Sequence, residues 1–129
     1  MEEIRINCLV SKKCGGCQLS NMTYQQQLSF KQAKVVRLLG KMHRVEKIVP
    51  SPRVLHYRNK VQAAFGRTKS GMIISGVYQS STHQIVKTDS CRIEDETADA
   101  IIVTVRKLLG EFGLTVYDDQ FYIQPYEGE

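Results

Sequence analysis

Four cysteines are the residues of this chain best suited to chemistry, and their spacing is uneven. Cys8, Cys14 and Cys17 lie close together near the start, and Cys91 follows far down the chain. Thiolate sulfur is a ligand for zinc and for iron–sulfur clusters, so four thiols can hold a metal centre. If all four do so, no cysteine remains to act as a nucleophile.

Three kinds of site are compatible with four cysteines. Disulfides need an oxidising compartment, and the chain opens without an apolar signal segment, which predicts a cytoplasmic protein. Zinc sites built from four cysteines usually pair two close Cys-x-x-Cys units, whereas here one such unit stands between two single cysteines. Three clustered ligands with one remote ligand are closer to ferredoxin-type spacing. The spacing therefore favours an iron–sulfur cluster, with zinc as the alternative.

The residues around the Cys14–Cys17 unit predict a tight turn. Its two central glycines permit the positive φ angles of such turns, and their N–H groups can point at sulfur. Lys12 and Lys13 precede the turn, and positive charge beside a thiol lowers its pKa. We therefore expect thiols of lowered pKa that suit a metal site here.

The charge of the chain is divided unevenly. The net charge is +5 over 129 residues. Residues 1–60 carry 12 Lys/Arg against 3 Asp/Glu, a balance of +9, whereas residues 61–129 carry 6 against 10, a balance of −4. This asymmetry indicates a polyanionic partner, most naturally nucleic acid, although a solvated basic helix face explains the same charges. No apolar run reaches membrane-spanning length, so no membrane partner is expected.

Several polar and aromatic residues are candidates for contact with RNA. The run 57–60 places a ring, a guanidinium, an amide and an ammonium in successive positions, which can stack on a base and bind a phosphate. An ordinary polar approach to a strand explains the run equally well, and a lone histidine is weak evidence. The candidates are Lys12, Lys13, Tyr57, Arg58, Asn59, Lys60 and His83. Neither paired carboxylates nor a glycine-rich nucleotide loop is found, so no catalytic residue is predicted.

Two helices are expected to position these residues. Thr23 and Gln26 fit a capping box, which predicts a helix at about 24–41 whose apolar stripe is interrupted by Gln32. Apolar residues repeat on one helical face over 98–112, with acidic residues before them and a glycine directly after.

Short strands fill the space between and after the helices. A hairpin turn is expected at 67–71, with Gly76 as a bulge in the following strand. The predicted strands are 45–49, 60–65, 72–78, 83–88 and 114–117. The fold class is therefore α+β, with a mainly antiparallel sheet, two helices and an irregular N-terminal cysteine-rich segment.

Five motifs occur in order along the chain. They are Cys8-x5-Cys14-Gly15-Gly16-Cys17-Gln18, Tyr24-x2-Gln27-Leu28-x2-Lys31, Tyr57-Arg58-Asn59-Lys60, Gly76 with Tyr78, and Thr82-His83-x-Ile85-Val86 before Cys91. Together they resemble the bacterial RNA (uracil-C5-)methyltransferases that carry an iron–sulfur cluster and make 5-methyluridine in ribosomal RNA. The resemblance covers nearly the whole chain, from about residue 8 to residue 118.

The resemblance implies a cofactor, a partner and a division of roles. The family binds a four-iron four-sulfur cluster through cysteines that match Cys8, Cys14, Cys17 and Cys91, and the cluster is structural or RNA-organising. The domain that holds it helps to bind RNA, and the helix at about 24–41 packs on the methyltransferase domain. S-adenosylmethionine, a nucleophilic cysteine and a general-base glutamate belong to a Rossmann-like domain that follows in the family.

The chain departs from the family at both ends. Residues 1–118 are expected to be the cluster-binding central domain without its catalytic domain or the N-terminal RNA-binding barrel, and residues 119–129 form an atypical tail. Because methyl transfer needs a free thiolate, the chain alone is expected to be inactive. The alternative is a free-standing RNA-binding module with a structural four-cysteine metal site. A small electron carrier is disfavoured, since the scaffold is basic and no second cluster is evident.

Overall fold

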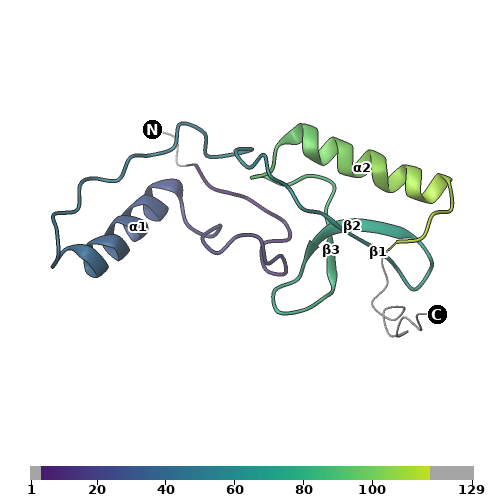
Figure 1. The fold of residues 1–129 in the computed structure, drawn as a ribbon, viewed down its shortest axis with the longest axis horizontal. Helices are drawn as coiled ribbons and strands as arrows, with labels where there is room; N and C mark the ends of the chain where they lie inside the picture. The colour runs from purple at the N-terminus through teal and green to yellow at the C-terminus, as the bar shows by residue number, and fades with distance from the viewer. Residues whose placement is uncertain (1–3, 117–129) are drawn as a thin grey trace, which may run out of the picture.

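The computed structural model describes residues 4–116 as an elongated α+β molecule (Figure 1). A three-stranded antiparallel sheet has the order β1-β2-β3, and the second helix packs against its central strand. The first helix lies at the opposite end of the molecule (Figure 1). The predicted fold class, with two helices and an antiparallel sheet, is confirmed. The elements are α1 (Tyr24–Leu39), β1 (Ala64–Arg67), β2 (Ile73–Tyr78), β3 (Ile85–Lys87) and α2 (Glu96–Glu111).

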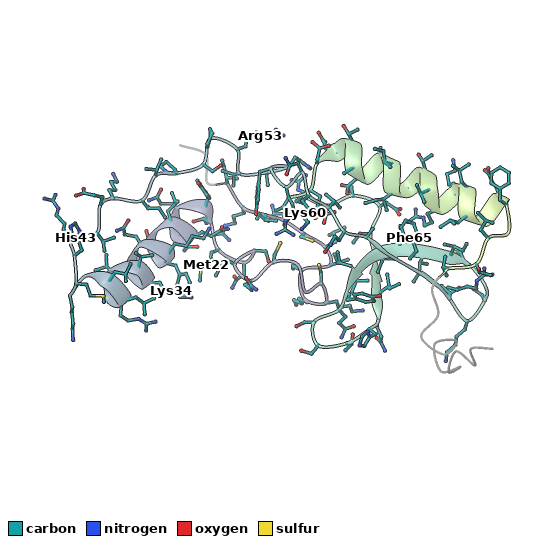
Figure 2. All side chains as sticks on the ribbon, viewed as in Figure 1. Met22, Lys34, His43, Arg53, Lys60 and Phe65 are labelled. Atoms are coloured by element: carbon teal, nitrogen blue, oxygen red, sulfur yellow. The ribbon has the colours of Figure 1, made fainter. Side chains whose placement is uncertain are left out.

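α1 begins where the capping box predicts. The Thr23 hydroxyl accepts the N–H of Gln26 at 3.3 Å, and the Gln26 side chain accepts the N–H of Thr23 at 2.9 Å. The helix ends at Leu39, two residues earlier than predicted, and Gly40 is its C-cap. The side chains of α1 project largely into open space, Lys34 among them (Figure 2).

The segment 45–49 is not a strand, which corrects the prediction. The side-chain amide of Gln32 in α1 holds it instead: Nε2 donates to the Glu46 carbonyl at 3.1 Å, and Oε1 accepts the Ile48 N–H at 2.6 Å. One carboxamide thus takes the place of the peptide group that a neighbouring strand would offer. The same residue that interrupts the apolar stripe of α1 is therefore a structural link.

The β1–β2 hairpin turns close to the predicted position. The N–H of Gly71, whose φ is +86°, donates to the Thr68 carbonyl at 2.9 Å. β1 starts four residues later than the predicted strand 60–65, because the residues before Ala64 have no partner in the sheet. The predicted strands 72–78 and 83–88 correspond to β2 and to the shorter β3.

Gly76 is not a bulge, because β2 keeps a regular register on both sides. It lies opposite Ala64 in β1 and opposite Lys87 in β3. A Cβ at this position would be 2.0 Å from the carbonyl oxygen of Val86. The glycine is required by the close approach of β3, and its backbone freedom is not the reason.

Side-chain and backbone groups satisfy both ends of α2. The Asp95 carboxylate accepts N–H groups of the first turn at 2.9 and 3.3 Å. After the helix, the N–H of Gly113 (φ +60°) donates to Gly110 and the N–H of Leu114 donates to Leu109. This Schellman motif ends the helix as the glycine predicts. Residues 114–116 are not a strand, and the last residue of that predicted strand lies outside the described residues.

The apolar core is small and lies beside one cysteine. Among residues 4–116, Ile93 is the only buried hydrophobic residue, with 3% of its surface exposed. Glu94 and Asp99 are also buried and close to Cys91 in the chain. None of the described helices is long and apolar enough to cross a membrane.

Candidate metal centre and nucleic-acid interface

Separate segments bring the four cysteines to the wall of one cavity. Cys8, Cys14, Cys17 and Cys91 all line it, together with Arg58, and its volume is about 50 Å³. All four thiols are free and partly buried. The fold thus gathers the residues that the spacing singles out as metal ligands.

The turn that begins at Cys14 is held against the β2–β3 hairpin. Cys14 forms an isolated antiparallel bridge with Gln79, and the N–H of Gly15 donates to the Tyr78 carbonyl at 3.3 Å. A Cβ at Gly15 would lie 3.3 Å from that same oxygen. Neither Gly15 nor Gly16 has a positive φ, so that prediction is wrong. Gly15 allows close packing, and the N–H of Gly16 donates to Cys14 Sγ at 3.3 Å, as predicted.

Cys91 is placed by the segment that joins β3 to α2. Its N–H donates to Oδ2 of Asp99 at 2.7 Å, in the first turn of α2. Burial raises the pKa of the Cys91 thiol, and hydrogen bonds from the backbone N–H groups of Ile93 and Glu94 offset part of that rise. Three groups, the Asp99 carboxylate and two backbone N–H groups, therefore hold this cysteine in place.

The thiols influence one another electrostatically. Burial raises the pKa of Cys17, and the charges of Cys91, Cys14 and Cys8 raise it further, whereas Arg58 lowers it. Burial also raises the pKa of Cys91. A metal centre binds thiolates, so its positive charge would offset the mutual repulsion that these shifts express.

Arg58 is the cation that acts on these thiols. The prediction that Lys12 and Lys13 lower the thiol pKa is wrong for Cys17, whose pKa is raised. The cation that acts to lower the pKa of Cys17 is Arg58. The backbone of Arg58 is fixed by a parallel bridge to Glu94, with its N–H donating to Ile93 at 2.8 Å. This places a guanidinium beside the cysteine cavity.

Residues 57–60 do not all point to one place. Arg58 lines the cysteine cavity and is partly buried. Tyr57, Asn59 and Lys60 are exposed, with Tyr57 at 51%. Of this run, only Arg58 lines the cysteine cavity, and contact of the run with RNA stays a prediction.

The remaining RNA candidates flank the cysteine turn. Lys12 and Lys13 are exposed directly before Cys14. His83 is exposed in the β2–β3 loop, and its ring lies edge-to-face with Tyr78 at 5.8 Å between centroids. The sequence motifs include Tyr78 but assign it no role. The feature that could have indicated a role is an aromatic residue at the end of a strand that leads into a polar loop.

Two buried carboxylates beside Cys91 were missed as site residues. Asp99 accepts the Cys91 N–H, and burial together with the Asp99 charge raises the pKa of Glu94, against the effect of Arg58. In the sequence, both residues are typical of the acidic start of a helix. No local signal reveals the pairing, because it depends on the return of the chain onto the cysteine site.

A guanidinium ties α2 to the sheet and to the approach to Cys91. Arg106 donates from Nη1 to the Ser75 hydroxyl at 3.1 Å and from Nη2 to Asp89 at 2.6 Å. Ser75 is fully buried in β2. The contact therefore fixes the register of α2 over β2, and with it the position of Asp99.

Curated relatives match this chain over most of its length. An uncharacterized RNA methyltransferase of Clostridium tetani is 39% identical over 117 residues, which is 88% of this chain. This chain is a relative of RNA methyltransferases. Uncharacterized RNA methyltransferases of Halalkalibacterium halodurans and Synechocystis are 34% and 30% identical over 92% and 93% of the chain. The chain spans about a quarter of the length of these methyltransferases, 25% to 27%. No family model matches it.

Proposed function

We propose that this chain is the cluster-binding and RNA-binding segment of an S-adenosylmethionine-dependent RNA (uracil-C5-)methyltransferase that makes 5-methyluridine in ribosomal RNA. The observation that carries the proposal is the meeting of all four cysteines at one cavity, in a chain related to RNA methyltransferases over 88% of its length. The proposed cofactor is a four-iron four-sulfur cluster, and zinc is the alternative.

The donor set fits such a cluster. Four-iron clusters are held by four cysteine thiolates, each on a different iron, so the thiols should surround a small cavity. Cys8, Cys14, Cys17 and Cys91 do so. No three Cys, His, Asp or Glu side chains within residues 4–116 form a group suited to a single metal ion. When bound, the cluster would join three chain segments and neutralise their thiolates.

Backbone donors support the sulfurs of the proposed cluster. Gly16 donates to Cys14, and two N–H groups that follow Cys91 donate to its sulfur. Hydrogen bonds of this kind stabilise charge on ligating sulfur and orient the ligands. This chain contributes ligand geometry and local electrostatics.

Methyl transfer itself is proposed to need a further part of the enzyme. A thiolate must add to the uracil ring before its C5 can attack a methyl group, and all four thiols of this chain line the cavity. We therefore assign the nucleophile, the general base and the S-adenosylmethionine site to residues outside these 129. Incubation with S-adenosylmethionine and a uracil-containing RNA should give no methylated product, and methylation would refute this assignment.

α1 is the surface that we propose contacts the methyltransferase domain. Its apolar side chains are exposed, including Val35 at 41%, Leu38 at 60% and Leu39 at 50%. No other element packs on it extensively in the described chain. A surface helix of a complete domain would bury such a stripe. A separately made methyltransferase domain should bind the chain, and Leu38→Asp should weaken that binding while leaving the helix content unchanged.

One measurement tests the cofactor. The chain is purified without oxygen, and iron, sulfide and zinc are determined with the visible spectrum. We expect about four iron and four sulfide per chain. Cys91→Ala should lose the cluster, whereas Ser90→Ala, which changes a neighbouring residue on the same cavity wall, should keep it. Zinc without iron would overturn the cofactor proposal.

A further inference from the structure

We infer that the open groove between the Cys14–Cys17 turn and the β2–β3 hairpin binds one unstacked base and its phosphate in single-stranded RNA. The inference rests on the proposed function and names a contact site for its RNA. The groove has a volume of about 570 Å³. This size lies within the range of pockets that hold small ligands, and the open shape lets a strand continue past it.

Two aromatic rings form one side of the groove. Tyr78, which is 46% exposed, and His83 both line it. Their planes meet at 68°, so one ring presents its edge to the other and keeps its own faces free. Aromatic side chains of this kind stack on bases that have left the RNA helix.

Hydroxyl groups lie beside the rings. Ser80 and Ser81 line the groove and are exposed. Their hydroxyls make no hydrogen bond within residues 4–116, so they are free to donate to phosphate oxygens. No carboxylate is among the described residues that line the groove. The exposed Lys12 and Lys13 directly precede the Cys14–Cys17 turn, whose two glycines line it. The surroundings therefore suit an anionic backbone.

The groove is shaped before a ligand binds. The N–H of Gln79 donates to Gln84 at 2.8 Å, and the N–H of Thr82 donates to Gln79 at 3.1 Å, which closes the hairpin loop. Ser81 holds a φ of +60°, a conformation that few residues other than glycine adopt. Across the groove, Gly15 fixes the cysteine turn to β2. Such preorganisation reduces the entropic cost of binding.

The arrangement also connects the RNA site to the cluster. The Cys14–Gln79 bridge joins the ligand-bearing turn to the loop that carries the rings. Loss of the cluster should therefore loosen one wall of the groove. This gives the proposed cluster a physical role in RNA binding that needs no redox chemistry.

The test measures binding of a short fluorescent oligouridylate by anisotropy, with the iron-loaded chain. Tyr78→Ala and His83→Ala should each raise Kd about 5- to 100-fold, the effect of losing one base–aromatic stack. Tyr78→Phe keeps the ring and should bind like the wild type. Phe112→Ala removes an aromatic residue that is 71% exposed after α2 and serves as the matched control.

A second measurement covers the case in which a variant fails to fold. The wild-type chain is crosslinked to an oligonucleotide that carries 4-thiouridine, and the modified peptide is identified by mass spectrometry. Crosslinks at Tyr78 or His83 support the groove. If the wild type binds RNA but crosslinks elsewhere, or if both alanine variants bind like Phe112→Ala, the groove inference is wrong and the proposed function stands. If the wild type binds no RNA, the proposed function itself fails.

Discussion

Gly76→Ala is expected to destabilise the sheet far more than its single methyl group suggests. The new Cβ would lie 2.0 Å from the Val86 carbonyl oxygen, 2.9 Å from the Val86 carbonyl carbon and 3.1 Å from the Thr88 nitrogen. Real Cβ atoms do not approach below 3.0 Å, so β3 must move by about 1 Å. All three atoms are backbone, so no side-chain rotation can relieve the clash.

The magnitude follows from what such a movement breaks. Overpacking of this kind costs about 1–3 kcal/mol. In the variant, the movement of β3 would also strain the hydrogen bond from the Thr88 N–H to the Ser75 carbonyl, which is 3.1 Å in the wild type. This adds about 1 kcal/mol to the loss of stability. We expect a loss of about 2–4 kcal/mol, a large part of the stability of a small domain. Because Thr88 leads to Cys91, iron content should fall as well.

Gly110→Ala is the matched control. A Cβ there would meet nothing within 4 Å, and Gly110 lies inside α2. The same substitution should therefore stabilise the chain by up to about 1 kcal/mol. Urea unfolding followed by circular dichroism gives both values at constant m. Equal stability of Gly76→Ala and the wild type would refute the close-approach argument.

Three other substitutions test individual contacts. Asp99→Ala leaves the partly buried N–H of Cys91 without its acceptor. It should lower the unfolding free energy in urea by about 1–3 kcal/mol and lower the iron content, whereas Asp99→Asn should recover most of both. Gln32→Ala releases the segment after α1, so trypsin should cut faster after Lys47, and an unchanged rate would contradict the carboxamide link. Thr23→Ala removes the cap and should lower the unfolding free energy by about 1 kcal/mol; no change would show that the capping box is dispensable.

The helices were predictable because their signals are local. The Thr23–Gln26 capping box lies at the start of α1 and determines where that helix begins. The glycine directly after α2 determines where α2 ends. The predicted strand 45–49 failed for the opposite reason. The hydrogen-bonding partner of this segment is the side chain of Gln32, and no strand pattern in the sequence encodes that.

The cysteine set was also predictable, whereas its surroundings were not. The chain has four cysteines, and their number and spacing are visible in the sequence. The identity of the neighbouring cation depends on which side of the segment at 57–60 faces the cavity, and Arg58 is placed there by its bridge to Glu94. The carboxylate of Asp99 reaches Cys91 because α2 packs on β2. These are tertiary contacts with no sequence spacing to reveal them.

The small core and the cysteine site occupy the same place, which has a consequence for folding. Ile93, the one buried hydrophobic residue among those described, donates its N–H to Cys91 and accepts the N–H of Arg58 at 2.8 Å. A single buried side chain contributes about 2–3 kcal/mol, far less than a domain needs to offset its conformational entropy. A metal centre that binds only the folded chain adds its binding free energy to stability. The proposed cluster, once bound, would therefore supply stability that a larger apolar core supplies in other domains of this size.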